Sequence, residues 1–185
     1  MNQASVIWLA LSDSSLQSFY ESYLSEVQVP VVHFSGALHF PKMTSAHPLM
    51  SFPVGLMPNS IYSRIHFVLS NGQTLKNIMP GFSNTFTALQ ENHKNNYHAL
   101  CVIAGNFPQL LWAEVLPEFE KMQIPAFAIE TYIRQISENF IEQKQDALTG
   151  PLIRNDQTTI EMNMRALKNL KLKKIYNSFV EVFNK

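Results

Sequence analysis

The sequence predicts an α/β domain over residues 1–88 and an all-helical domain over residues 89–185. Two observations support this division. Residues Ser5–Leu11 (SVIWLAL) form a continuous apolar run rich in β-formers, which is typical of a strand buried on both faces of a parallel sheet. From about Asn92 onward the apolar residues instead recur with helical spacing. We therefore expect a sheet in the front part and only helices in the back part.

The N-terminal segment is expected to form a strand, a helix and a second strand. Asp13 or Ser14 can cap the helix, and the second short apolar run, Val31–Phe34, follows Pro30. This order is a βαβ unit, in which the two strands lie parallel. The apolar stripe of the helix consists of Leu16, Phe19, Tyr20, Tyr23 and Leu24.

Further strands and helices follow a proline-punctuated stretch. Residues Ile65–Leu69 (IHFVL) predict a strand closed by a turn at Asn71-Gly72. Helices are expected over about 92–119, 126–144, 158–170 and 173–183, and Pro108 should kink or split the first of them. Tyr97 and Cys101 fall on the apolar face of that first helix. Apolar residues nearly encircle its later part, which predicts burial on all sides: Leu110, Leu111, Trp112, Val115 and Leu116.

Composition and charge exclude several classes of protein. Hydrophobic residues make up 46% and charged residues 15%, which is not the composition of a disordered chain. Fourteen basic residues balance fourteen acidic ones, so no global field attracts a polyanion and no nucleic-acid partner is expected. Asn106, Glu114 and two prolines interrupt the stretch Ala99–Phe119, so no membrane span is expected. The single cysteine, Cys101, and the lack of a basic leader indicate a cytoplasmic protein without disulfides.

The six glycines do not form a phosphate-binding loop. No two of them are spaced as in G-x-G-x-x-G, and none precedes Lys and Ser or Thr as in a P-loop. A complete βαβ unit needs roughly 30 residues, whereas four residues precede Ser5. We therefore expect the first, dinucleotide-binding unit to be missing from this chain.

Four segments occur in a characteristic order: HFSGAL (His33–Leu38), SAHPLMSF (Ser45–Phe52), NNYHALCVIAGN (Asn95–Asn106) and ALTGPLIRND (Ala147–Asp156). Together they resemble an uncharacterised bacterial family with a Rossmann-like front and a helical C-terminal domain of unknown function. That family is similar to the superfamily of phosphogluconate dehydrogenase, pyrroline-carboxylate reductase and deazaflavin-dependent NADP reductase. The similarity extends from about residue 5 to about residue 180.

The resemblance implies a fold, a cofactor and an assembly. The front would be the second half of a Rossmann-like parallel sheet, and VIWLALSDSSL would match the fourth strand of the family and its turn. Full-length relatives would use NADP or NAD. The C-terminal helices would form the substrate side and a homodimer interface.

Ligands of open α/β sheets bind beyond the carboxyl ends of the strands. Ser12 and Asp13 follow the first expected strand, and Ser35 and Gly36 follow the second. We expect these four residues to line a cofactor crevice. A purely structural role is the alternative, with Asp13 as a helix cap and Gly36 as a turn glycine, and the two roles are compatible.

His47, His98 and Asn106 are the candidate catalytic residues. Pro48 favours an extended backbone at His47, and an imidazole near neutral pKa can donate a proton to a carbonyl that is being reduced. A buried histidine bonded to the backbone is the alternative. His98 and Asn106 lie about two turns apart on one helix. The resemblance implies a lysine and an asparagine on such a helix, so His98 or Lys94 would take the lysine role, and Asn106 would orient the substrate.

The segment around ALTGPLIRND supplies candidate substrate-binding residues. Thr149, Gly150 and Pro151 predict a stiff turn, and Asp156 can cap the next helix. The guanidinium of Arg154 offers a bidentate fork for an anion, the alternative being a structural contact with Asp156. No histidine or cysteine spacing fits a metal site, and none is expected.

Two functions remain open at this point. One is an NAD(P)-dependent oxidoreductase acting on a small carbonyl or imine, impaired by the missing nucleotide unit. The other is a non-catalytic helical dimerisation module derived from such an enzyme. The missing glycine-rich unit favours the second, and the four segments above favour the first.

The glycine pattern predicts weak cofactor binding. Without backbone amides at a glycine-rich helix N-terminus, the pyrophosphate loses its main binding site. The 185-residue chain should bind NADPH with a dissociation constant near millimolar, on the order of −4 kcal/mol. Titration followed by the fluorescence of Trp8 and Trp112 measures this affinity. Micromolar binding would contradict the prediction.

Overall fold

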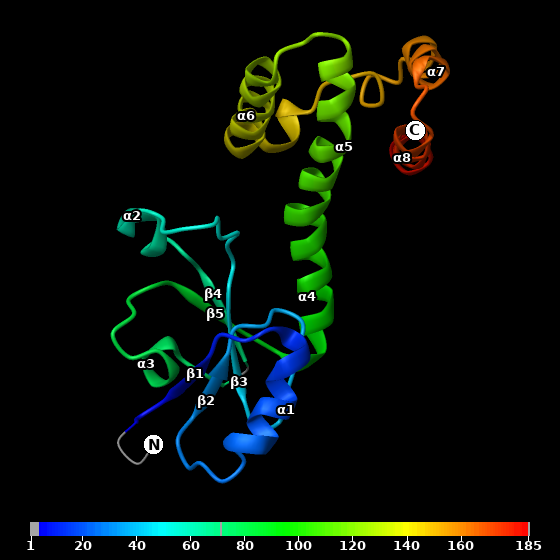
Figure 1. Ribbon diagram of the computed structural model, residues 1–185. Coiled ribbons are helices and arrows are strands. Elements are labelled where there is room, and N and C mark those ends of the chain that lie inside the picture. Colours follow the sequence, from blue (N-terminus) through cyan, green and yellow to red (C-terminus); the bar gives the residue numbers. More distant parts are fainter. Residues whose placement is uncertain (1–3, 71, 185) are drawn as a thin grey trace. The chain divides into compact units, whose positions relative to one another are not determined.

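The computed structural model describes residues 4–70 and 72–184 (Figure 1). The chain forms two compact units, residues 1–107 and residues 108–185, and each is described by itself. The continuous helical part of the chain begins at Glu91, close to the expected change at residue 89, and its first segments, up to Asn106, belong to the first unit.

The first unit contains a five-stranded sheet in the order β1-β2-β3-β4-β5. Strands β1, β2 and β3 pair in parallel, β3 and β4 are antiparallel, and β4 and β5 are again parallel. The expected α/β front with a mostly parallel sheet is therefore confirmed, with one antiparallel pair within it. The strands are β1 (Ile7–Leu9), β2 (Val31–His33), β3 (Thr44–Pro48), β4 (Phe67–Ser70) and β5 (Phe86–Leu89).

The first strand differs in detail from expectation, whereas a turn is present at Gly72. Trp8 on β1 is 42% exposed, so this strand is not buried on both faces. The indole N–H of Trp8 donates a hydrogen bond to the carbonyl oxygen of Ile78 at 2.8 Å. The rest of the ring remains partly exposed. In the predicted turn, Gly72 has φ +74°, a backbone conformation that favours glycine; Asn71 lies outside the described residues.

Helix α1 (Asp13–Tyr23) completes the βαβ unit, but its cap differs from the prediction. The N-cap is Ser12, without a side-chain capping bond, so the prediction of Asp13 or Ser14 as the cap was wrong. Asp13 is already the first helical residue, and its carboxylate is free to bond elsewhere.

The predicted stripe of α1 is only partly buried. Leu16 and Leu24 are buried and Tyr20 packs beside them, whereas Phe19 and Tyr23 lie at the surface and stack on each other at 4.9 Å between ring centroids. Residues four apart follow one narrow line of the helix, and only that line reaches the sheet.

The core of the first unit has two clusters, one on each face of the sheet. Neighbouring residues on a strand point to opposite faces; accordingly, Val31 belongs to the cluster with Leu16 and Leu24, and Val32 to the other cluster. The second cluster holds Leu75 and Ile78 from the short helix α3 (Leu75–Ile78). In Figure 1, α1 and α3 lie on opposite sides of the strands. Another short helix, α2 (Asn59–Tyr62), precedes β4.

The sheet leads into a long helix built from several segments. A 3-10 turn η1 (Glu91–His93) precedes α4 (Lys94–Cys101), the π-helical turn η2 (Val102–Asn106) and α5 (Phe107–Lys121). Pro108 was expected to kink or split the helix, but the helical path continues through it. A proline ring crowds the carbonyl four residues earlier, and the wider π turn before Pro108 relieves that crowding.

By length and composition, one helix among the described residues, Glu91–Lys121, could cross a membrane. The core helix of a soluble protein meets the same criterion, so the finding alone does not decide between the two. None of the residues in its most apolar stretch is buried in the structure.

The second unit is helical throughout. It contains most of α5, then α6 (Ala126–Gln143), the 3-10 turn η3 (Lys144–Ala147), α7 (Gln157–Ala166) and α8 (Leu170–Phe183), which confirms the expected all-helical part. Its buried apolar residues are Ile129, Ile160 and Leu172.

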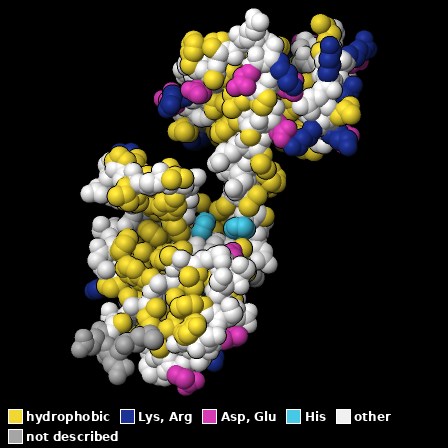
Figure 2. All heavy atoms as spheres, in the orientation of Figure 1, with side chains coloured by type: hydrophobic (Ala, Val, Ile, Leu, Met, Phe, Trp, Pro, Cys, Tyr) yellow, Lys and Arg dark blue, Asp and Glu magenta, His cyan; other side chains and the backbone are white. Residues whose placement is uncertain are grey.

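Helix α5 was expected to be buried on all sides, yet it has no buried residue, and Leu110 is 64% exposed. Figure 2 shows apolar side chains spread over the visible surface. A single copy of the chain therefore leaves much of this apolar surface uncovered.

Candidate functional site

The loops after β1 and β2 meet at the carboxyl ends of these strands. The hydroxyl of Ser35 donates to Asp13 Oδ2 at 2.9 Å and accepts from the backbone N–H groups of Ala37 and Leu38 at 3.2 and 3.0 Å. Asp13 therefore fixes Ser35, and Ser35 fixes the turn that carries Gly36. Ser12 instead shares hydrogen bonds with the hydroxyls of Ser14 and Ser15 at the start of α1.

Gly36 lies between two histidine side chains. A Cβ atom at this position would come within 2.9 Å of His47 Nε2 and 2.9 Å of His98 Cδ2. Real Cβ atoms do not approach other atoms so closely, so only glycine fits here without moving the rings. The structure thus brings His47 from β3 and His98 from α4 to one point, next to the residue that follows β2.

His47 is held by a tyrosine on the same helix as His98. The Nδ1 atom of His47 lies 2.6 Å from the hydroxyl of Tyr97, and the two rings meet edge to face. The extended backbone expected at His47 is confirmed, since the residue lies within β3. The alternative, a buried histidine bonded to the backbone, does not describe Nδ1, because the partner of that atom is a side chain.

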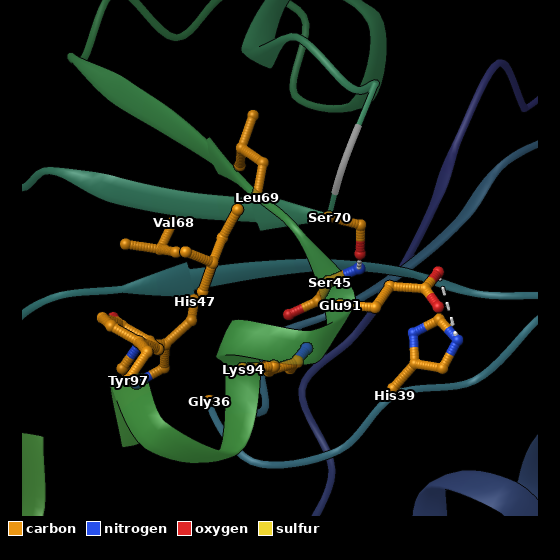
Figure 3. A pocket seen from close by; sticks show the side chains of 11 residues that line it. Gly36, His39, Ser45, His47, Val68, Leu69, Ser70, Glu91, Lys94 and Tyr97 are labelled. Carbon is orange, nitrogen blue, oxygen red and sulfur yellow. Dashed lines mark hydrogen bonds and ion pairs between the residues drawn. The ribbon is translucent and has the colours of Figure 1, made fainter. Parts of the chain in front are cut away.

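A small pocket opens beside this pair (Figure 3). Its volume is about 10 Å³, room for about one water molecule. In Figure 3, Lys94 extends from the first turn of α4 across the pocket, with His47 and Tyr97 on one side and Ser45 and Glu91 on the other. The lining residues are Gly36, His39, Ser45, His47, Val68, Leu69, Ser70, Leu89, Glu91, Lys94 and Tyr97.

Burial changes the protonation of the groups at this site. It lowers the pKa of His47 below its ordinary value, and the neighbouring His98 and Lys94 lower it further. Burial also lowers the pKa of Lys94 to about 8, against smaller opposing effects of Asp13 and Glu91. The same cause raises the pKa of Tyr97. Near pH 7 the site therefore holds a neutral His47, a protonated Tyr97 and a charged Lys94.

His33 at the end of β2 is a buried neighbour of this site. It is fully buried, and burial lowers its pKa to about 4, so it is neutral at physiological pH. Its Nδ1 accepts from the backbone N–H of Ser35 at 3.3 Å, while its Nε2 has no partner among the described residues. His33 supports the turn that carries Ser35 and Gly36.

The other predicted residues lie outside this pocket. Asn106 is exposed, at the end of the π turn, and is not among the residues that line the pocket. Thr149, Gly150 and Arg154 belong to the turn before α7, in the second unit, where Gly150 has φ +108° and Arg154 is exposed. Asp156 caps α7 as predicted, accepting from the backbone N–H of Thr159 at 3.1 Å. The substrate-binding roles of these residues stay predictions.

Sequence reasoning missed most of the residues that line the pocket. Tyr97 falls on an apolar helix face in the sequence, and the sequence patterns assign no role to His39, Ser45, Ser70 or Glu91. The spacing of Lys94, Tyr97 and His98 within one turn of helix was the available signal, since polar groups interrupt an apolar face there. Among the described residues, no group of three or more histidine, cysteine or acidic side chains could hold a metal ion.

The close packing around Gly36 predicts what happens when a methyl group is added at this position. In Gly36→Ala the new Cβ should push the His47 ring away from its buried position, and the His47 pKa should rise toward its ordinary value as burial decreases. An NMR titration of the imidazole protons measures this shift. Gly105→Ala is the matched control, because no atom lies within 4 Å of a Cβ placed there. An unchanged His47 pKa in Gly36→Ala would show that the ring is not held by this contact.

Two solved structures share the fold of this chain. A protein of Bacteroides fragilis described as a "putative NADP oxidoreductase" matches with a TM-score of 0.80 and 20% sequence identity, over 98% of this chain and 75% of that one. A protein of Thermotoga maritima matches with a TM-score of 0.72 and 20% identity, over 96% of this chain and 75% of that one. At this identity the likeness establishes the fold. No curated protein matches the sequence.

The sequence itself also matches a protein family. The profile of the family described as domain of unknown function DUF2520 matches residues 70–182, which is more than half of the 185 residues. The matched segment includes α4, with Lys94, Tyr97 and His98, and the helices of the second unit. The chain therefore belongs to the DUF2520 family.

Proposed function

We propose that this pocket is the substrate side of an NAD(P)-linked oxidoreductase that acts on a small carbonyl or imine compound. The observation that carries the proposal is the 2.6 Å hydrogen bond between His47 Nδ1 and the Tyr97 hydroxyl. The fold shared with the Bacteroides fragilis protein supports the reaction class.

The His47–Tyr97 pair orients a proton donor. Because Tyr97 keeps its proton, we assign its O–H as the donor to His47 Nδ1, which leaves the proton of the neutral imidazole on Nε2. Nε2 is the atom of His47 nearest to Gly36 and hence to the crevice beyond β2. Reduction of a carbonyl places negative charge on its oxygen, and an N–H group held in position stabilises that charge and can supply the proton. His98, on the other side of Gly36, is the second candidate donor.

The residues of this chain do not fit the pyrophosphate of a dinucleotide. Asp13, the first residue of α1, places a carboxylate at the helix end where a phosphate would bind. The glycines provide no loop that could wrap a phosphate. Ser12, Asp13, Ser35 and Gly36 thus remain candidates only for contacts to other parts of a cofactor, and we derive no step of the reaction through it.

A screen for turnover tests the proposal. Small aldehydes, 2-oxo acids and cyclic imines are incubated with millimolar NADPH, and products are detected by mass spectrometry. We expect slow reduction of at least one compound, lost in His47→Gln, with a rate that rises as the pH falls through the lowered pKa of His47. His66→Gln, which changes a half-buried histidine that bonds to Thr85 and Thr87 outside the pocket, should retain the rate.

The alternative function is a non-catalytic dimerisation module. The small buried core of the second unit favours this alternative. Its buried apolar residues are Ile129, Ile160 and Leu172, and α5 contributes none. If neither the wild type nor His47→Gln reduces any compound, this alternative replaces the enzyme proposal.

We also propose that the exposed apolar face of α5 forms a homodimer of a soluble, cytoplasmic protein. We favour a second copy of the chain over a membrane as the partner of this face. The reason is that the same helix carries Lys94, Tyr97 and His98 at its N-terminal end, where they line or adjoin the pocket. Apolar patches of this kind mark protein interfaces.

Sedimentation tests this assembly. The wild type should sediment as a dimer at tens of micromolar, and Leu110→Glu should shift it toward the monomer, because a charge would be buried at the interface. Gln145→Glu adds the same charge at an exposed position outside α5 and should leave the dimer intact. A monomeric wild type would contradict the prediction.

A further inference from the structure

The ammonium group of Lys94 is half-buried at the pocket and has no counter-ion. Among the described residues, Lys94 takes part in none of the ion pairs within 4.0 Å. The two nearby acids are engaged elsewhere: Glu91 pairs with His39 at 3.3 Å, and Asp13 accepts the hydroxyl of Ser35. Removing a cation from water without pairing it costs free energy, so Lys94 is suited to an anion that arrives from outside.

The uncommitted polar groups around Lys94 are hydrogen-bond donors. Ser70 Oγ accepts from the backbone N–H of Ser45 at 2.9 Å, and its own proton has no acceptor in the described part of the chain. His47 presents Nε2, which carries the proton in the tautomer assigned above. Glu91, the acid that lines the pocket, pairs with His39, and Tyr97 donates its proton to His47. A ligand that complements this pocket must therefore accept hydrogen bonds and carry negative charge.

The size of the pocket limits the shape of that anion. A volume of about 10 Å³ admits one oxygen atom, since it corresponds to about one water molecule. A planar carboxylate can insert a single oxygen and leave the rest of the molecule outside. A phosphate could insert one oxygen in the same way, but its other oxygens would find no hydrogen-bond donors in a space of this size.

We propose that Lys94, with the hydroxyl of Ser70, binds the carboxylate of a small substrate, so that the compound reduced under the proposed function is a 2-oxo or 2-imino acid. The identification of the substrate class rests on that proposed function. The binding of a carboxylate does not depend on the proposed function, because it needs only the charge and the hydrogen-bond donors of the pocket.

Binding of simple anions, followed by two-dimensional NMR of the 185-residue protein, tests the site without turnover. Acetate and pyruvate should shift the signals of pocket residues, whereas acetamide and inorganic phosphate should bind more weakly. In Lys94→Gln the affinity for pyruvate should fall at least about tenfold, as expected for loss of a charged hydrogen-bond partner. Lys76→Gln is the matched control, because Lys76 is exposed on α3 and does not line the pocket.

The pH dependence gives a second readout. Anion binding needs protonated Lys94, so the affinity of the wild type should fall as the pH rises through about 8. Lys94→Arg should keep its affinity there, because a guanidinium stays charged. Wild-type affinity in Lys94→Gln, or equal binding of acetamide and acetate, would overturn the proposal, and tighter binding of phosphate would identify a phosphate site instead. If carboxylates bind but no compound is turned over, only the proposed function is refuted. If uncharged carbonyl compounds are reduced as well as acids are, only the carboxylate site is refuted.

Discussion

His47 and His98 reach Gly36 from two different elements, strand β3 and helix α4, and the missing side chain at Gly36 permits this approach. Through the turn held by Asp13 and Ser35, the same contact joins the ends of β1 and β2 to the helix. Close-packed groups transmit small displacements to their neighbours. The positions of the two imidazoles, the Tyr97 hydroxyl and the first turn of α4 therefore depend on the close packing around Gly36.

The electrostatic character of the pocket follows from that packing. Burial disfavours charge, which keeps His47 neutral and weakens the hold of Lys94 on its proton. The nearby carboxylates of Asp13 and Glu91 are committed to a hydroxyl and to His39. The pocket thus combines one unpaired cation with neutral donors, an arrangement that stabilises negative charge on a ligand or on a transition state.

One helical path joins two different kinds of surface. Its N-terminal turn lies against the sheet and presents polar groups, whereas α5 presents apolar side chains that a single chain leaves exposed. The π turn between them accommodates Pro108 without ending the helix. The hydrophobic effect penalises exposed apolar area, and this exposed face of α5 is the basis of the homodimer proposed above.

The sequence by itself determined the α/β front, the helical back, the parallel βαβ unit and the cap at Asp156, because these depend on local periodicity and on short-range backbone hydrogen bonds. It also identified His47, His98 and Gly36 as candidates. Only the tertiary structure decided that β4 runs antiparallel to β3, that Ser12 is the N-cap of α1, and that Tyr97 bonds to His47 instead of joining a core. It likewise placed Asn106 outside the pocket and left Lys94 without an ion pair to any residue that the structure describes. These outcomes depend on contacts between residues far apart in the sequence, such as Gly36 and His98, which are 62 positions apart. Local patterns cannot encode such contacts, because long-range packing selects which polar groups meet and which remain free.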